Sequence, residues 1–316
     1  MNGTMNGNPR IAFCAPGAKP DAWLRELNRL LPHADVFAWS GSEDAAADYA
    51  VVWTPPDAFF AAQPKLKALF NLGAGVDGLM RNAALPSHVP VIRIEDAGMA
   101  PLMAEYVCQA AIRHARELDG MEADARAGIW NPRKPTERPD YPVGVMGLGA
   151  LGLPVAEALV SFGFTVSGWS RSARTHGRIR CHAGDAGLDA FLRGTRILVC
   201  VLPLTQETEN ILDATTLNKL LPDAYLINVA RGRHLVDDDL LALLDSGRLA
   251  GATLDVFRQE PLPAAHRFWR HPKITLTPHC SALTQRDRTL AQIAQKIEAL
   301  ERGEAVTGMV ELGRGY

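Results

Sequence analysis

The chain has 316 residues, more than one hydrophobic core usually supports, so its length favours two domains. Its 33 Lys and Arg residues against 35 Asp and Glu residues give a formal net charge of -2, which argues against nucleic acid or an anionic membrane as a partner. Five scattered cysteines without a C-x-x-C pair, and no apolar run long enough for a signal peptide or a membrane span, predict a cytoplasmic protein with neither a disulfide framework nor a bound metal.

Short runs of β-branched or aromatic residues alternate with helix-like stretches, which is typical of parallel sheets covered by helices on both faces. The N-terminal part contains an amphipathic stretch at residues 21–31 that predicts a helix. Strands are predicted at residues 11–14, 36–39, 51–53 and 69–72. These elements predict a small α/β domain.

A long helix is predicted from residue 101 to about 126, and the segment Trp130-Asn131-Pro132-Arg133-Lys134-Pro135 follows it as a surface connection because its prolines exclude a helix. A second series of strands is then predicted at residues 143–146, 165–169, 197–202, 225–229, 253–256 and 274–277. A last helix, at residues 286–300, is expected to return to the first domain. The predicted domains are therefore residues 1–98 plus 283–316, and residues 99–282.

The turn Gly147-Leu148-Gly149-Ala150-Leu151-Gly152 follows a predicted strand and opens a predicted helix. The first glycine permits a tight turn, the second lets backbone N–H groups approach a pyrophosphate, and the third lets the helix pack on the strand. Pro154 is comfortable only in the first turn of a helix, so the helix is expected to start near Leu151. This context predicts dinucleotide binding by residues 147–152.

Cofactor choice is usually decided at the end of the second strand, which here reads Gly168-Trp169-Ser170-Arg171-Ser172. An acidic residue there would accept from the ribose 2′-OH of NAD and repel the 2′-phosphate of NADP. No acid is present, whereas Ser170, Arg171 and Ser172 offer hydroxyls and a guanidinium to a phosphate. The segment therefore predicts a preference for NADP(H), with NAD(H) possible; the alternative is a solvated basic turn.

Three polar residues, Arg231, Glu260 and His279, each follow the end of a hydrophobic run. In open α/β sheets, ligands bind at the carboxyl ends of the strands. A guanidinium that can fork onto a carboxylate, together with a histidine that has a carboxylate partner, supplies what reduction of a 2-keto acid needs. Taken singly they have plainer interpretations, a solvent-facing arginine, a loop carboxylate and a histidine at a strand end, but their joint presence favours catalysis.

The arrangement resembles the D-isomer-specific 2-hydroxyacid dehydrogenase family over nearly the whole chain, and within it a subgroup of reductases that act on small 2-keto acids. The motifs that carry the resemblance are Gly73-Ala74-Gly75-Val76-Asp77, the glycine turn, Leu202-Pro203-Leu204-Thr205, Asn228-Val229-Ala230-Arg231-Gly232, Leu254-Asp255-Val256, Glu260-Pro261 and Thr277-Pro278-His279. The subgroup is suggested by Glu95-Asp96-Ala97-Gly98-Met99, Trp169-Ser170-Arg171 and Arg314-Gly315-Tyr316.

The resemblance implies an α/β fold of two doubly wound parallel-sheet domains, Rossmann-like and flavodoxin-like, the first discontinuous and binding substrate, the second binding the dinucleotide. It implies that Arg231 holds the substrate carboxylate together with backbone N–H groups of Ala74 and Gly75, and that Asp255 orients the nicotinamide amide. It further implies that His279 donates the proton, assisted by Glu260. The other residues expected at the cofactor are Leu202, Pro203, Thr205, Val229 and Ala230, and Trp53 is expected at the substrate.

The predicted function is NADPH-dependent reduction of a small 2-keto acid, such as glyoxylate to glycolate or hydroxypyruvate to glycerate. An NAD-linked dehydrogenase of the phosphoglycerate type is an alternative, against which the missing acid after Trp169 counts. A dinucleotide-sensing regulator of the corepressor type stays open because it shares the fold and can keep the same three residues. A homodimer is also expected, in which the helix from Pro101 and the 130–139 connection embrace the partner's nucleotide domain.

Overall fold

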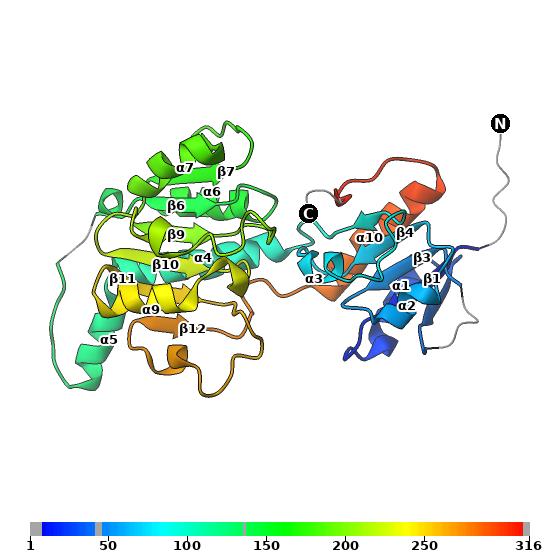
Figure 1. The fold of residues 1–316 in the computed structure, drawn as a ribbon, viewed down its shortest axis with the longest axis horizontal. Helices are drawn as coiled ribbons and strands as arrows, with labels where there is room; N and C mark the ends of the chain where they lie inside the picture. The colour runs from blue at the N-terminus through cyan, green and yellow to red at the C-terminus, as the bar shows by residue number, and fades with distance from the viewer. Residues whose placement is uncertain (1–7, 42–45, 135–136, 312–316) are drawn as a thin grey trace. The chain divides into compact units, whose positions relative to one another are not determined.

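The computed structural model describes residues 8–41, 46–134 and 137–311. It divides into a first unit, Met1–Gly98 with Thr284–Tyr316, and a second unit, Met99–Leu283. The motif Arg314-Gly315-Tyr316, and Pro135 of the predicted connection, lie outside the described residues. Each unit is built on one parallel sheet with helices packed against it (Figure 1).

The sheet of the first unit has five strands in the order β2-β1-β3-β4-β5, all parallel, which is the flavodoxin-like order. The strands are β1 (Arg10–Cys14), β2 (Asp35–Ala38), β3 (Tyr49–Val52), β4 (Ala68–Asn71) and β5 (Val91–Ile92). The central strands β3 and β4 are buried along their whole length, as continuous apolar runs predict for a strand covered on both faces. Strand β5 was not predicted, because two residues are too few to show a pattern.

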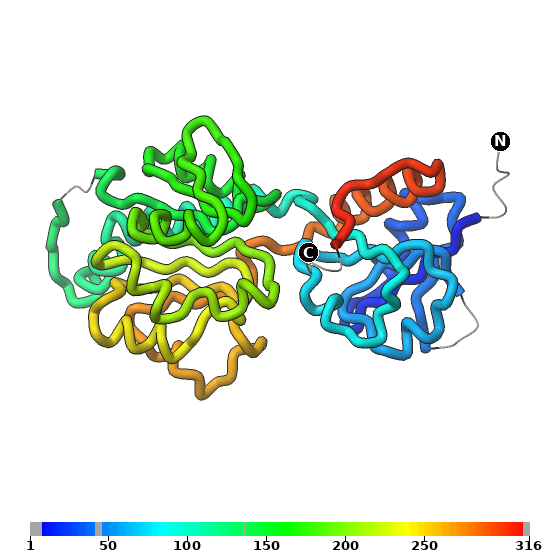
Figure 2. Tube along the Cα trace, turned by 45° about the horizontal axis from the view of Figure 1, so that its top comes forward, coloured from blue at the N-terminus to red at the C-terminus, as the bar shows by residue number. Residues whose placement is uncertain are grey.

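The helices of the first unit are α1 (Pro20–Leu30), α2 (Asp57–Ala61), α3 (Asp77–Met80) and α10 (Arg286–Glu301). Helix α10, which was predicted at residues 286–300, packs beside α1, and its Glu301 accepts a 2.6 Å hydrogen bond from the Tyr49 hydroxyl. The segment after α10 runs along the edge of the sheet, where Val310 N–H donates to Val91 O at 2.8 Å (Figure 2). The C-terminal part of the chain therefore completes the first unit.

The sheet of the second unit has seven strands in the order β12-β11-β10-β9-β6-β7-β8, all parallel. The strands are β6 (Val143–Met146), β7 (Val166–Ser170), β8 (Arg180–Ala183), β9 (Ile197–Cys200), β10 (Ala224–Asn228), β11 (Leu249–Leu254) and β12 (Ile274–Leu276). This is the Rossmann order with one further strand, and its order reverses between β6 and β9. The predicted fold class, two doubly wound parallel-sheet domains, is thus confirmed.

Helices cover both faces of the second sheet. One apolar cluster joins α4 (Met99–Ala115) and α6 (Gly152–Ser161) to the sheet, and another joins α7 (Gly184–Arg193), α8 (Ala214–Leu217) and α9 (Asp237–Asp245) to the opposite face. Fully buried leucines and valines fill both layers. The two layers fix the strands, so that the loops at their carboxyl ends start from a rigid base.

Three predictions about element bounds were wrong. The long helix predicted at residues 101–126 is two helices, α4 and α5 (Leu118–Arg126), because Glu117 adopts a left-handed conformation with φ 54° and turns the chain. The strand predicted at residues 197–202 ends at Cys200, and the strand predicted at 253–256 is β11, which begins at Leu249 and ends at Leu254. In both cases the apolar residues continue past the last backbone pairing into the loop.

Candidate active site

The glycine turn between β6 and α6 uses each of its glycines for a different reason. Gly147 has φ +101°, and a Cβ there would lie 2.7 Å from Val201 O. A Cβ on Gly152 would lie 1.8 Å from Gly147 O, so helix and strand approach too closely for any side chain. A Cβ on Gly149 would meet no described atom within 4 Å. No neighbouring described atom therefore requires glycine at position 149, and the absence of a side chain there leaves the backbone accessible to a ligand.

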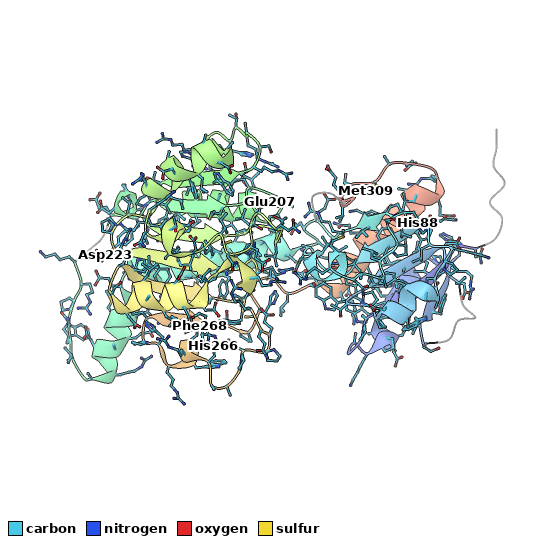
Figure 3. The ribbon with its side chains drawn as sticks, viewed as in Figure 1. His88, Glu207, Asp223, His266, Phe268 and Met309 are labelled. Carbon is cyan, nitrogen blue, oxygen red and sulfur yellow. The ribbon has the colours of Figure 1, made fainter. Side chains whose placement is uncertain are left out.

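The turn after β7 presents polar groups beside the glycine turn. Ser170 is buried and its hydroxyl donates to Ser172 O at 2.8 Å, which shapes the turn, while Arg171 is exposed. Glu207, labelled in Figure 3, has a lowered pKa because the Thr205 hydroxyl donates to it and, among smaller causes, because the positive charge of Arg171 lies nearby. Arg171 therefore faces the loop that follows β9.

The loop after β9, residues 201–212, is called the β9 loop here. Pro203 O accepts a hydrogen bond from the Thr208 hydroxyl at 2.7 Å, and the same hydroxyl accepts from Thr205 N–H at 2.8 Å. Leu202 is 8% exposed. Val201 O lies against Gly147, so this loop and the glycine turn are adjacent. Both lie where the strand order of the sheet reverses, which is the usual position of a bound dinucleotide.

Arg231 follows β10 in a short loop, residues 229–236, called the β10 loop. The buried Asn228 fixes it, because its amide group donates to Arg231 O at 3.1 Å and accepts from Ala230 N–H at 3.2 Å. A Cβ on Gly232 would lie 1.8 Å from the carbonyl carbon of Phe257. Only glycine allows the β10 loop to lie this close to the loop that carries Glu260. The Arg231 guanidinium also donates to Ala230 O at 2.7 Å.

His279 and Glu260 form a pair, with Nδ1 of the ring 2.8 Å from Oε2 of the carboxylate. The His279 side chain is 46% exposed, and its Nε2 lies on the side of the ring away from Glu260. Burial raises the pKa of Glu260, but hydrogen bonds from His279 and from Phe257 N–H, with the positive charges of His279 and Arg231, outweigh it and hold the pKa below its ordinary value. Glu260 is therefore ionised at neutral pH, and its carboxylate accepts a hydrogen bond from Nδ1–H of His279.

Asp255 positions His279. Its buried carboxylate accepts from the Thr277 hydroxyl at 2.6 Å, Cys280 N–H at 2.8 Å and Ser281 N–H at 2.9 Å, and its carbonyl accepts from His279 N–H at 2.8 Å. His279 itself has φ 52°, a left-handed conformation that these bonds hold in place. This set of bonds around His279 was not predicted; the one signal for it was an acidic residue between the apolar residues Leu254 and Val256.

Tyr106 of α4 extends this set of bonds. Burial raises its pKa to about 12, so the phenol stays protonated, and its oxygen lies 2.5 Å from the Thr277 hydroxyl that donates to Asp255. Tyr106 was not predicted as a site residue, because a tyrosine in a largely apolar helix is typical of the hydrophobic core.

The residues predicted to bind substrate fall in both units. Arg231 and His279 belong to the second unit, while Trp53, Ala74 and Gly75 belong to the first. Within the first unit, Asn71 donates to Gly73 O and Gly75 O, both at 2.9 Å, and so shapes the Gly73-Ala74-Gly75 loop. The Trp53 side chain is 42% exposed, and its ring packs against Gly73 so closely that a Cβ on Gly73 would lie 2.6 Å from the ring. The first unit thus brings Trp53 together with this loop.

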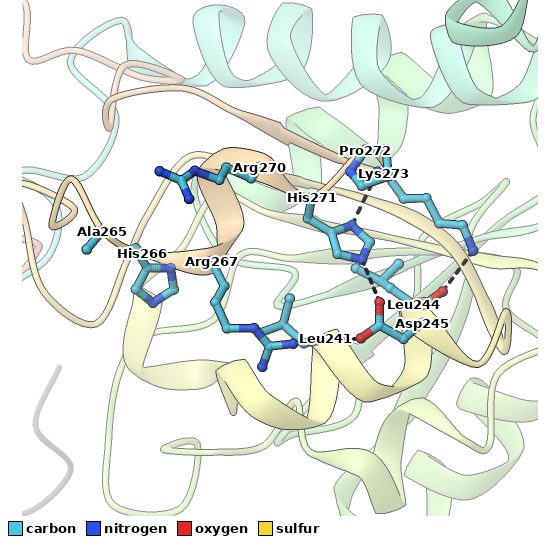
Figure 4. A pocket seen from close by; sticks show the side chains of 10 residues that line it. All are labelled: Leu241, Leu244, Asp245, Ala265, His266, Arg267, Arg270, His271, Pro272 and Lys273. Atoms are coloured by element: carbon cyan, nitrogen blue, oxygen red, sulfur yellow. Dashed lines mark hydrogen bonds and ion pairs between the residues drawn. The ribbon is translucent and has the colours of Figure 1, made fainter.

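A hollow of about 400 Å³ lies elsewhere on the second unit, between α9 and η3 (Arg267–Arg270) (Figure 4). Two of its polar side chains are bonded within the unit: His271 lies 3.2 Å from Asp245, and Lys273 donates to Leu244 O at 2.8 Å. It adjoins the amino ends of β11 and β12, whereas Arg231 and His279 follow carboxyl ends. The chemistry of the candidate site is therefore not in this hollow.

In residues 8–41, 46–134 and 137–311, no cluster of three or more His, Cys, Asp or Glu side chains is arranged to hold a metal ion. In the same part of the chain, no helix is both long and apolar enough to cross a membrane.

Comparison with known proteins gives concordant matches. Residues 108–281 match the NAD binding domain of D-isomer specific 2-hydroxyacid dehydrogenase. A glyoxylate/hydroxypyruvate reductase A of Serratia proteamaculans (strain 568) is 44% identical over 311 residues, which are 97% of this chain and 99% of that protein. The corresponding reductase of Yersinia enterocolitica is 40% identical over the same shares of the two chains.

Two solved structures are similar over almost the whole chain. A D-isomer specific 2-hydroxyacid dehydrogenase from Xanthobacter autotrophicus Py2, in complex with NADPH and MES, has a TM-score of 0.93 and 38% identity over 98% of this chain and 100% of that chain. The NADPH-dependent glyoxylate/hydroxypyruvate reductase of Sinorhizobium meliloti, in complex with NADP and sulfate, has a TM-score of 0.92 and 34% identity over the same shares. The chain therefore belongs to the D-isomer specific 2-hydroxyacid dehydrogenase family.

Proposed function

We propose that the protein is an NADPH-dependent reductase of small 2-keto acids, with glyoxylate and hydroxypyruvate as substrates. The observation that carries the proposal is the 2.8 Å pair of His279 and Glu260, placed at the carboxyl edge of a dinucleotide fold that also carries Arg231. The relatives named glyoxylate/hydroxypyruvate reductase A support the substrate class.

The residues at the glycine turn fit a dinucleotide. Gly149 leaves its backbone open, and the helix that begins at Gly152 directs its N-terminal N–H groups toward the space where a pyrophosphate would lie. Exposed Arg171 and the Ser172 hydroxyl fit a 2′-phosphate, whereas the buried Ser170 hydroxyl already donates to Ser172 O and shapes the turn, and no carboxylate at that turn opposes a phosphate. Similar proteins solved with NADPH or NADP support the same cofactor.

The cofactor supplies a hydride from its nicotinamide to the keto carbon, and the protein supplies orientation and charge. Arg231 binds the substrate carboxylate through paired N–H groups, with backbone N–H groups of Ala74 and Gly75 as further donors. Its positive charge also stabilises the negative charge that develops on the carbonyl oxygen. Asp255 holds the His279 loop, in addition to its expected role at the nicotinamide amide.

His279 provides the proton. With Nδ1 paired to ionised Glu260, the Nε2–H donates to the carbonyl oxygen as the hydride arrives. In the reverse reaction the neutral Nε2 accepts the hydroxyl proton. Glu260 therefore fixes both the orientation of the ring and the side on which the exchangeable proton lies.

A spectrophotometric assay of NADPH oxidation tests this proposal directly. Turnover with glyoxylate and hydroxypyruvate, and a higher kcat/KM with NADPH than with NADH, are expected. Preference for NADH with a phosphorylated hydroxypyruvate would instead favour the phosphoglycerate type of dehydrogenase. Dinucleotide binding without turnover on any of these acids would favour the corepressor type.

We also propose a homodimer and a cytoplasmic location. Helix α5 has no buried residue, and the connection after it exposes Ile129 and 96% of Trp130. A large apolar ring in that position suits a protein interface, and the charged residues of α5 suit its polar rim. The cysteines Cys14, Cys108 and Cys200 are buried and unpaired, as befits a reducing compartment.

A further inference from the structure

His234 is fully buried in the β10 loop and has no part in the proposed chemistry. Its ring lies between two backbone carbonyl groups: Nδ1 is 3.1 Å from Arg231 O and Nε2 is 3.3 Å from Pro203 O. The first carbonyl belongs to the arginine of the substrate site, and the second belongs to the β9 loop beside the glycine turn. A single rigid side chain thus spans the two loops.

The backbones of the two loops are also paired around this ring. Leu212 N–H donates to His234 O at 2.9 Å, and Asn210 N–H donates to Arg233 O at 3.0 Å. The Arg233 side chain is bonded to Glu209 at 2.6 Å. The loops follow adjacent parallel strands, β9 and β10, so they lie side by side. Within the β10 loop, His234 N–H also donates to Arg231 O at 3.2 Å, whereas the His234 ring joins this carbonyl group to Pro203 O.

The carbonyl group of Arg231 has two side-chain contacts at 3.1 Å, one from Asn228 and one from His234. Asn228 belongs to β10 itself and holds the peptide to the sheet. His234 holds the same peptide to Pro203, that is, to the loop on the cofactor side. A neutral imidazole has one N–H and can donate to one carbonyl at a time, whereas the imidazolium donates to both.

We infer that His234 is a positioning residue that couples occupancy of the dinucleotide site to the position of Arg231. A bound dinucleotide contacts the β9 loop and so fixes the position of Pro203 O. The His234 ring, bonded to this carbonyl, then fixes the peptide of Arg231. In that position the Arg231 guanidinium is oriented to bind a carboxylate. The inference rests on the proposed function, since it takes Arg231 as the carboxylate-binding residue and the β9 loop as part of the cofactor site.

The coupling is measurable with oxamate, a 2-keto acid analogue whose amide carbonyl is not reduced. Its dissociation constant is determined by calorimetry with and without saturating NADPH, and the ratio of the two values is the coupling factor. The wild type is expected to show a factor of about 5 or more, the lower end of usual allosteric coupling. His234→Leu, which fills the space without bonding either carbonyl, should reduce the factor about fivefold and raise the KM for glyoxylate more than it lowers kcat.

Thr208→Val is the matched control. Thr208 bonds the same Pro203 O at 2.7 Å but does not bridge to Arg231, so this variant should weaken NADPH binding while its coupling factor stays within about twofold of the wild type. His234→Gln is the second variant: its amide keeps polar groups, but the flexible side chain lacks the rigid ring whose two nitrogens lie at Arg231 O and Pro203 O, and it should lose coupling as His234→Leu does. Direct contact between nicotinamide and oxamate is common to all these proteins and cancels in the comparison.

Unchanged coupling in both His234 variants, or the same loss in Thr208→Val, would overturn the inference, and so would a wild type whose oxamate affinity does not respond to NADPH. A purely structural role would lower the melting temperature of the His234 variants without changing the ratio. Failure of the proposed function looks different, because the wild type would then bind NADPH without reducing glyoxylate or any of the related acids.

Discussion

At the scale of single residues, Arg171 gives the most selective prediction. Arg171→Ala should raise the KM for NADPH far more than the KM for NADH, because only NADPH has a 2′-phosphate for the guanidinium. A charge-assisted hydrogen bond contributes about 1.5–3 kcal/mol, so the selectivity should fall by roughly 10- to 100-fold. Steady-state kinetics with both cofactors measure it.

Arg193→Ala is the control for this experiment, because Arg193 is an exposed arginine paired with Asp189 on α7. It should leave both cofactor constants unchanged. Equal effects of Arg171→Ala on NADPH and NADH would show that Arg171 is a solvated turn residue.

The pair of Glu260 and His279 predicts how activity depends on pH. The pKa of Glu260 is held below its ordinary value, so the carboxylate keeps its charge through neutral and mildly acid pH and loses it only as the pH falls through that lowered pKa. In the wild type, kcat/KM for reduction should therefore fall on acidification through the lowered pKa of Glu260, because the carboxylate then no longer accepts from His279 as an anion. Glu260→Gln keeps a hydrogen-bond partner but carries no charge at any pH, so its kcat/KM should be lower at neutral pH and this acid limb should be absent; pH profiles of the two proteins measure the difference.

Removal of the proton donor is a separate prediction. His279→Ala should slow reduction by roughly 100-fold or more, the contribution of a positioned general acid, while NADPH binding measured by fluorescence stays close to that of the wild type. Near-normal turnover in this variant would remove His279 from the mechanism. An equal loss of NADPH binding would show a role in holding the cofactor instead.

At this scale the sequence predicted the residues whose position follows from strand ends. Arg231, Glu260 and His279 come after apolar runs, and the carboxyl ends of parallel strands lie at one edge of a sheet. The side chains that hold them were not predictable in the same way. Asn228 bonds a carbonyl group three residues away, Asp255 bonds N–H groups 25 and 26 residues away, and the position of His234 depends on Pro203 in another loop.

At the scale of elements, the glycine turn predicts two different outcomes for the same substitution. Gly152→Ala should destabilise the protein by several kcal/mol, because its Cβ would lie 1.8 Å from Gly147 O and the helix would have to move from the strand. Gly149→Ala meets no described atom within 4 Å, so it should change the melting temperature little and weaken NADPH binding instead. Thermal unfolding with and without NADPH separates the two effects. Loss of stability in Gly149→Ala without loss of NADPH affinity would contradict this assignment.

Strands in the middle of each sheet were predictable because they are buried on both faces and so consist of continuous apolar residues. The edge strand β8 was missed, since its side chains are partly exposed and its composition, Arg-Cys-His-Ala, resembles a loop. The bend between α4 and α5 was missed for another reason. It depends on the left-handed conformation of Glu117 and on Arg113, which bonds Asp119 and Glu122 across the bend, and none of these follows from periodicity.

At the scale of the whole molecule, the proposed homodimer is testable through Trp130. Light scattering at micromolar concentration should give twice the mass of the 34.2 kDa chain. Trp130→Ser should shift the mass toward that of a monomer, because it removes a large apolar group from the interface. Trp269→Ser is the control, since Trp269 is a second exposed tryptophan, 54% exposed, but lies on η3. A monomeric wild type would remove the proposal.

The first unit is assembled from two stretches of chain, because α10 contributes its buried face, Leu290, Ile293 and Ile297, to a sheet made of residues before Gly98. During synthesis the ribosome must produce all of Met99–Leu283 between these stretches, which takes on the order of 10 to 40 seconds at usual rates. The second unit is continuous and can fold as it emerges. The N-terminal strands are synthesised first, but their apolar surface stays partly uncovered until α10 has been synthesised. We expect chaperones to bind this surface during that interval.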